Sequence, residues 1–397
     1  MFSHIDPIRI TRIKKEFFNG THRVVDPEKT LETIKPLMPE IGVVEVEDIT
    51  HLDRLGIPVY SAFRPGAKLG ATKVHAGKGT MPVHAEVSAM MEAVERYSAE
   101  YKGEYMLHDT FEGIGLAKAV DPVDLILPRR LESGERLHWT LSWDIMNDEE
   151  IYIPSNAVFH PYDPVGMAQQ LFRSDTNGLA SGNVIEEAIL HAIFEVIERD
   201  ALSDAENSRS LGKRIIVDRD GPAKEMLDIF ESNGVKIYLW LIEGKTGVPT
   251  VAAGGDDTET KDPLLLVMGS GTHLNPEIAV LRALTEVAQS RGSSLKGGKE
   301  DAKRRMLVEK AGYERLKRIN RMWFKEDAET IKLSEIPDKS TDYIDEDLKV
   351  TLEELNGHAD RVCVCDLSKT PVPVVRVVIP GLEVSYMDKS RMRKRNG

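Results

Sequence analysis

The sequence of 397 residues has little cysteine and no long apolar stretch. Its two cysteines, Cys363 and Cys365, alternate within VCVCDL, a pattern typical of a buried strand and too sparse for a disulfide framework. No run of about 18 apolar residues is present to form a membrane-spanning helix, and the first residues lack the apolar core of a secretion signal. We therefore expect a cytoplasmic protein without a membrane partner.

Positive charge is also in short supply. The chain has 52 Lys and Arg residues against 65 Asp and Glu residues, which gives a formal net charge of −13. Binding to nucleic acid depends on basic side chains that neutralise phosphate groups. We therefore do not expect a nucleic-acid partner for a protein this acidic.

The common motifs of nucleotide and metal enzymes are absent too. The sequence contains no G-x-x-x-x-G-K-[ST] loop, no G-x-G-x-x-G after a strand, and no protein-kinase motif set. Neither H-E-x-x-H nor a pair of C-x-x-C motifs occurs, which argues against a zinc site. A nucleotide site in this chain would therefore belong to an uncommon fold.

Helical and strand patterns mix along the whole chain, which predicts an α/β fold. Apolar residues recur at helical spacing over 26–40, 82–101, 183–204, 221–233, 275–290 and about 300–325. Short apolar runs predict strands at 42–48, 56–62, 236–242, 249–253, 263–269 and 372–379. No linker separates two domains, so we expect one large domain over residues 56–397, with residues 1–55 as an N-terminal extension packed on it.

One pattern occurs twice among the predicted helices. E-x-x-E-R is found at 92–96 and again at 195–199, each time behind a loop that contains glycine, 77–80 in the first case and 177–183 in the second. At about 100° per residue, acidic side chains form narrow stripes beside the apolar faces of three helices. The stripe residues are Ser88, Glu92 and Glu95; Glu187, Glu195 and Glu198; and Arg282, Glu286 and Gln289.

Carboxylates beside an apolar face need partners, because buried like charges repel one another. Mg²⁺ prefers oxygen ligands and is commonly shared between carboxylates and nucleotide phosphates. The nearby arginines Arg96, Arg199 and Arg282 suit phosphate binding. The pattern therefore indicates a magnesium–nucleotide site. The alternative is a set of structural ion pairs, with an ordinary turn at 77–79 and a core position for His191.

Several segments resemble the signature blocks of the YcaO family. They are 77–100 (GKGTMPVHAEVSAMMEAVERYSAE), 177–201 (NGLASGNVIEEAILHAIFEVIERDA), 279–291 (AVLRALTEVAQSR) and a closing strand and turn at 372–383 (VPVVRVVIPGLE). The resemblance covers most of the chain. It implies a single large YcaO-type catalytic domain, in which mixed sheets are joined by helices that carry an ATP and Mg²⁺ site.

The resemblance also implies a reaction and assigns residues to it. YcaO enzymes use ATP to phosphorylate a backbone amide oxygen of a peptide or protein, and a nucleophile then displaces the phosphate from the activated carbon. The implied metal-binding residues are Glu92, Glu95, Glu187, Glu195 and Glu198. The implied nucleotide-binding residues are Ser88, Asn183, Arg199, Arg282 and Glu286, together with Arg23 and Thr30, which depart from the family in residue type. No catalytic side chain is assigned, and His191 is a candidate only for proton transfer.

The nucleophile distinguishes the branches of this family. A Cys, Ser or Thr side chain would give an azoline, an amine would give an amidine, and sulfide would give a thioamide. The chain ends in YMDKSRMRKRNG, without the proline-rich tail common in azoline-forming members, and nothing in it resembles a leader-peptide-binding module. We therefore expect a stand-alone thioamide-forming enzyme, similar to those of methanogenic archaea.

This branch implies particular partners. The expected substrate is a glycine in the α subunit of methyl-coenzyme M reductase, converted to thioglycine with sulfide that a TfuA-like protein delivers, and the expected assembly is a homodimer. The open alternatives are an azoline-forming cyclodehydratase, an accessory ATP-binding protein that assists another modification enzyme, and a metal-dependent ligase or phosphohydrolase acting on small molecules.

Overall fold

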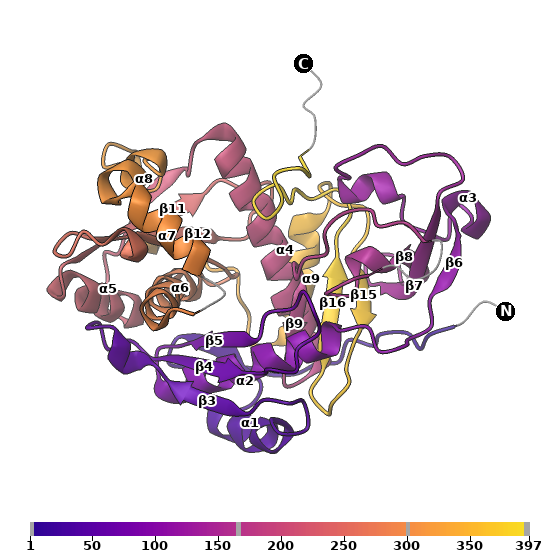
Figure 1. Ribbon diagram of the computed structural model, residues 1–397, viewed down its shortest axis with the longest axis horizontal. Helices are drawn as coiled ribbons and strands as arrows, with labels where there is room; N and C mark the ends of the chain where they lie inside the picture. Colours follow the sequence, from indigo (N-terminus) through magenta and orange to yellow (C-terminus); the bar gives the residue numbers. More distant parts are fainter. Residues whose placement is uncertain (1–3, 164–167, 299–301, 393–397) are drawn as a thin grey trace.

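The computed structural model describes residues 4–163, 168–298 and 302–392. It has a mixed α/β architecture, as the sequence predicts. The long helix α4 (Ile185–Ser208) runs through the middle of the molecule, between two larger sheets (Figure 1). A smaller sheet lies below them in this view, with helices α1 (Pro27–Ile34) and α2 (Pro82–Ala99). Within the described part of the chain, no helix combines the length and hydropathy of a membrane span.

One of the larger sheets has the strand order β13-β12-β11-β10-β14 and is antiparallel except at the β10–β14 pair. Its strands are β10 (Lys213–Ile216), β11 (Val235–Ile242), β12 (Thr250–Asp257), β13 (Val267–Thr272) and β14 (Thr330–Lys332). Helix α6 (Pro276–Lys296) packs closely on β13. This is possible because Gly271 has no Cβ; a Cβ there would meet Ala279 O at 2.4 Å. Helix α5 (Pro222–Ser232) packs on β11 and α6.

The other large sheet has the order β6-β7-β15-β16-β9, with β8 beside β7. Its strands are β6 (Leu107–Thr110), β7 (Arg136–Asp144), β8 (Glu149–Pro154), β9 (Leu179–Ser181), β15 (Cys363–Asp366) and β16 (Val374–Val378). The valine-rich strand β16 is buried on both faces and contacts α4. Helix α9 (Ile344–Leu355) packs on α4, and the short helix α3 (Phe111–Ile114) follows β6.

The smaller sheet has the order β3-β4-β5, with β3 (Glu45–Asp48), β4 (Val59–Phe63) and β5 (Val74–Lys78). A separate hairpin of β1 (Glu16–Phe18) and β2 (Thr21–Arg23) precedes it. Strand β3 lies before residue 55 and pairs with β4, which lies after it. The sheet therefore joins the two sides of the expected boundary, and the division into extension and domain stays a prediction.

Two expected helices are interrupted. The helix expected over 26–40 ends at Ile34 and continues as a tighter 3-10 turn over 35–37, which contains Pro36. The helix expected at about 300–325 is divided into α7 (Ala302–Ala311) and α8 (Tyr313–Ile319) by Gly312, whose positive φ of 75° ends the first helix. Residues 300 and 301 lie outside the described residues.

Two expected strands have different outcomes. Over 263–269, only the end is a strand, because Pro263–Leu265 forms a 3-10 turn in which the Asp262 side chain accepts from Leu264 N at 2.8 Å. The buried strand expected around the cysteines is confirmed. Cys363 and Cys365 both lie in β15 and are almost fully buried, so neither thiol is open to solvent.

Candidate functional site

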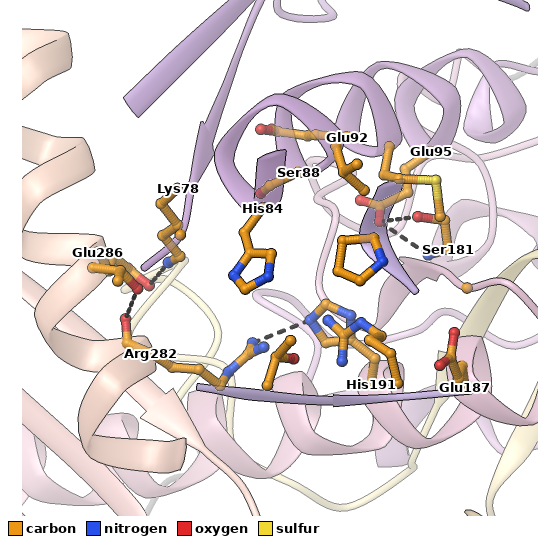
Figure 2. Close-up of a pocket in the computed structure, with 18 of the residues that line it drawn as sticks. Lys78, His84, Ser88, Glu92, Glu95, Ser181, Glu187, His191, Arg282 and Glu286 are labelled. Atoms are coloured by element: carbon orange, nitrogen blue, oxygen red, sulfur yellow. Dashed lines mark hydrogen bonds and ion pairs between the residues drawn. The ribbon is translucent and has the colours of Figure 1, made fainter. Parts of the chain in front are cut away.

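A cavity of about 370 Å³ is lined by residues of α2, α4 and α6, by strands β5 and β9, and by the N-terminal segment around residues 20–30 (Figure 2). All of the residues assigned to metal or nucleotide binding lie around it. They are Arg23, Thr30, Ser88, Glu92, Glu95, Asn183, Glu187, Glu195, Glu198, Arg199, Arg282 and Glu286. The cavity therefore brings together side chains that are up to 263 positions apart in the sequence, from Arg23 to Glu286.

Strand β5 brings one unexpected side chain to the cavity. The strand lies directly against α2 because Gly77 has no Cβ; a Cβ there would meet Ala85 O at 2.1 Å. The prediction of an ordinary turn at 77–79 is therefore wrong for its first two residues, which belong to β5. The Lys78 side chain reaches the cavity, where its Nζ lies 2.6 Å from Glu286 Oε2.

The acids of α2 have different partners. Glu92 Oε1 accepts from Arg96 Nη2 at 3.1 Å, one helical turn away. Glu95 Oε1 instead accepts from the backbone N and the Oγ of Ser181, at 2.9 and 2.7 Å. Burial raises the pKa of Glu95 to about 7. Ser181 was missed in the sequence because the loop at 177–183 contains the short strand β9, whose pairing with the distant β16 has no local signal.

Helix α4 carries two acids that both lie close to one arginine. Arg199 Nη2 lies 3.9 Å from Glu195 Oε1, and its Nη1 lies 3.3 Å from Glu198 Oε1. Glu198 Oε1 also accepts from Ser270 Oγ on β13, at 2.8 Å. Burial raises the pKa of Glu195. Burial opposes the charge of Arg199, but Glu198 and Glu195 outweigh it and raise the pKa of the guanidinium.

Glu187 has a structural task in addition to its place at the cavity. Its Oε2 accepts from Asn183 N and Nδ2 at 2.8 and 3.0 Å, and these hydrogen bonds cap the N-terminus of α4. Its Oε1 accepts from Val24 N at 2.7 Å. Thr30 Oγ1 donates to Asn183 Oδ1 at 2.7 Å. These contacts hold the N-terminal segment against the start of α4.

Helix α6 supplies the remaining predicted side chains. Arg282 Nη2 donates to His191 Nε2 at 3.1 Å, and burial lowers the pKa of this histidine well below its usual value. Gln289 Nε2 donates to Ala76 O of β5 at 2.7 Å. Burial opposes ionisation of Glu286, but Lys78 and Arg199 face it and lower its pKa overall.

The chemistry of these groups fits a metal-bound polyphosphate. Carboxylate oxygens are the ligands that Mg²⁺ prefers, and guanidinium N–H groups bind phosphate. The Nε atoms of Arg96, Arg199 and Arg282 are buried and lack hydrogen-bond partners, so they are donors still available. Among the described residues, no three His, Cys, Asp or Glu side chains are already grouped as a metal site. Glu92, Glu195 and Glu198 would therefore have to exchange their arginine partners for the metal.

Comparison with known proteins identifies the family. The model for "YcaO cyclodehydratase", described as ATP- and Mg²⁺-binding, matches residues 76–383. The chain belongs to the YcaO family. A protein of Methanothermobacter thermautotrophicus is 48% identical to this YcaO protein over 380 residues, which are 94% of this chain and 98% of the relative.

Two further similarities bear on its biology. A Rhizobium leguminosarum bv. trifolii protein, described as lying in the tfuA 3′ region, is 30% identical over 389 residues, or 91% of this chain and 89% of that one. The structure of YcaO from Methanopyrus kandleri, bound with AMPPCP and Mg²⁺, has a TM-score of 0.79 and 32% identity and covers 96% of this chain and 99% of its own. The expected fold and family are confirmed, and ATP with Mg²⁺ is the cofactor pair of that family.

Proposed function

We propose that this YcaO protein activates a backbone amide of a peptide or protein by O-phosphorylation and converts it to a thioamide through attack by sulfide. The observation that carries the proposal is the cavity in which acids of α2 and α4 lie beside buried arginines with unpartnered Nε atoms. An amide oxygen is a weak nucleophile toward phosphorus. Positioning and charge neutralisation must therefore supply most of the rate, and these side chains suit both tasks.

Mg²⁺–ATP would supply the phosphoryl group and much of the charge neutralisation. The side chains of this cavity would hold it and orient the peptide. The proposed metal-binding residues are Glu92, Glu95, Glu187, Glu195 and Glu198. The proposed nucleotide-binding residues are Arg23, Thr30, Ser88, Asn183, Arg199, Arg282 and Glu286. Glu187 would bind metal only through oxygens that already accept from Asn183 and Val24, so it would do more to position than to neutralise.

The proposed substrate is a glycine of the methyl-coenzyme M reductase α subunit, which would become thioglycine. The supporting observation is the similarity to proteins of the methanogens Methanothermobacter and Methanopyrus over nearly the whole chain. A TfuA-like protein is proposed to deliver the sulfide, because one relative lies beside tfuA. We also propose a homodimer, on the resemblance to the family alone.

An azoline-forming cyclodehydratase is the second candidate function, because the matching family model is described by that activity. The products separate the candidates by mass. Exchange of oxygen for sulfur makes a peptide heavier, whereas azoline formation removes one water. An accessory ATP-binding protein would leave the peptide mass unchanged. A peptide in which glycine is followed by Cys, Ser or Thr, incubated with the protein, Mg²⁺–ATP and sulfide, therefore distinguishes all three by mass spectrometry.

The nucleotide site itself is tested by calorimetry. We expect wild-type protein to bind ATP with Mg²⁺ and to lose this binding in EDTA. Glu95→Gln and Glu198→Gln should bind at least about 10-fold more weakly, because removal of a carboxylate removes a metal ligand. Glu353→Gln, on the exposed side of α9, is the matched control and should bind like wild type. Unchanged binding and thioamide formation in both site variants would refute the metal assignment.

A further inference from the structure

We propose that His84 is the proton-transfer residue of this site, whose Nε2 takes the proton from sulfur as hydrosulfide adds to the activated amide carbon and passes it to the departing phosphate. The inference rests on the proposed function. It adds a proton acceptor that is not among the proposed metal-binding and nucleotide-binding residues.

His84 occupies a suitable place. It lies in the first turn of α2, one turn before Ser88 and on the same stripe as Glu92. Its side chain lines the cavity and projects into it between the Lys78–Glu286 pair and His191 (Figure 2). His84 therefore shares the cavity with Glu92 and Glu95 of α2.

A hydrogen-bond chain fixes which ring nitrogen of His84 carries the proton. The Thr80 hydroxyl donates its hydrogen to Asn19 O, so it has only lone pairs to offer the imidazole. His84 Nδ1 lies 3.2 Å from this hydroxyl and must therefore donate to it. A neutral imidazole with hydrogen on Nδ1 has its free lone pair on Nε2. His84 is thus held as the tautomer whose base is Nε2.

Two glycines hold this arrangement in place. A Cβ on Gly79 would meet His84 Cβ at 2.3 Å, so only glycine lets the loop before α2 approach the histidine this closely. Gly20, with φ of 103°, forms the turn of the β1–β2 hairpin, and a Cβ there would meet Thr80 Cγ2 at 2.9 Å. The hairpin turn therefore packs against Thr80, and the Thr80 hydroxyl orients His84 through its contact with Nδ1.

The protonation state agrees with this geometry. Burial lowers the pKa of His84, and Arg23 lowers it further, while Asp26 acts in the opposite direction. The imidazole is therefore neutral near pH 7. His191 is less suitable, because its Nε2 lone pair already accepts from Arg282.

The step balances in atoms and charge. The carbon–sulfur bond forms as hydrosulfide adds to the O-phosphorylated amide carbon, and His84 Nε2 accepts the S–H proton. The carbon–oxygen bond then breaks with its electron pair going to the phosphate oxygen, and this oxygen receives the proton from Nε2. Overall, the amide, hydrosulfide and ATP give the thioamide, ADP and hydrogen phosphate, and His84 returns to its starting state.

The first test compares His84→Gln with His358→Gln, a surface control. We expect His84→Gln to form thioamide about 100-fold or more slowly, the range of a lost general acid–base, while its Mg²⁺–ATP affinity stays within about threefold of wild type. Added imidazole should restore part of the rate. A wild-type rate in His84→Gln would overturn the proposal, whereas absence of thioamide from wild type with all substrates present would instead refute the proposed function.

The second test does not depend on turnover. Nitrogen-15 spectra of histidine-labelled wild-type protein should contain an Nδ1–H tautomer signal that is missing from His84→Gln. In Thr80→Val this signal should shift toward a mixture of tautomers, because the hydroxyl acceptor is lost, and the reaction should slow without loss of ATP binding. An Nε2–H tautomer for His84 in wild type would contradict the assignment, whatever the activity.

Discussion

Glu95 is a residue whose place at the cavity opposes the stability of the fold. Its pKa rises from 4.5 to about 7 because burial disfavours the charged form, although Arg96 and the Ser181 hydroxyl partly compensate. Above pH 4.5 this carboxyl ionises more readily in the unfolded chain than in the folded protein. The folded state is therefore penalised as the pH rises, and the penalty is complete above about pH 7.

Glu95→Gln should consequently stabilise the protein while removing a proposed metal ligand. The glutamine Oε1 can still accept from Ser181, and the buried charge is gone. We expect the free energy of unfolding to increase by about 1 kcal/mol at pH 8 and to be unchanged near pH 4, where both side chains are neutral. Denaturant titrations at the two pH values measure this. Lower stability of the variant at pH 8 would contradict it, and Glu353→Gln should show no difference.

Other site residues show what a sequence can reveal one position at a time. The stripe of Glu92 and Glu95 was predictable because the spacing of helical residues alone places them together. The sequence did not predict the places of three other residues, because each depends on a contact between distant segments. Strand β5 brings in Lys78, the hairpin turn orients His84 through Thr80, and β9 brings in Ser181. Arg23 and Thr30 came from family resemblance, and no local pattern distinguishes them.

At the scale of elements, the site depends on the close approach of β5 and α2. Two glycines in the segment before α2, Gly77 and Gly79, leave space for the helix backbone. A Cβ on Gly77 would lie only 2.2 Å from Ala89 N. Helix periodicity predicted α2, α4 and α6, because each has several turns of pattern. It did not predict this contact, which depends on the absence of a side chain.

Gly77→Ala should therefore separate β5 from α2. A methyl group has no space between backbone atoms, so we expect a loss of at least about 2 kcal/mol in the free energy of unfolding, together with weaker Mg²⁺–ATP binding as Lys78 moves. Gly66→Ala is the matched control, because a Cβ at this turn meets nothing within 4 Å. Urea denaturation of both variants decides the matter, and equal stability would disprove the packing argument.

Over the whole molecule, the N-terminal segment lines the cavity and is also held by contacts to α9. Lys15 Nζ forms a fully buried ion pair with Asp347 Oδ2 on α9, and Lys15 N donates to Asp342 O. The same segment continues into β2, whose Arg23 lines the cavity. Contacts of this range cannot be inferred from residue patterns, since no spacing rule links positions 15 and 347.

Breaking the Lys15–Asp347 pair should loosen the attachment of the N-terminal segment to α9. Asp347→Asn leaves the Lys15 charge without a partner, so we expect the free energy of unfolding to fall by about 3 kcal/mol and ATP binding to weaken. The double variant Lys15→Met, Asp347→Leu should recover much of the stability, because no buried charge remains. Thermal unfolding and calorimetry measure both effects, and a double variant as unstable as the single one would count against the explanation.

The arginine-paired acids of α2 and α4 have a final consequence. Arg96 and Arg199 neutralise the acids beside them, so the binding of Mg²⁺–ATP would exchange these ion pairs for contacts to metal and phosphate. On the proposed assignment, metal alone would displace Arg96 or Arg199 from carboxylates, and polyphosphate alone would draw those arginines away and leave the acids uncompensated. When both ligands bind, the polyphosphate pairs with the arginines that the metal displaces, and the metal neutralises the carboxylates that those arginines leave. Metal and nucleotide should therefore promote one another's binding, with neither tight alone.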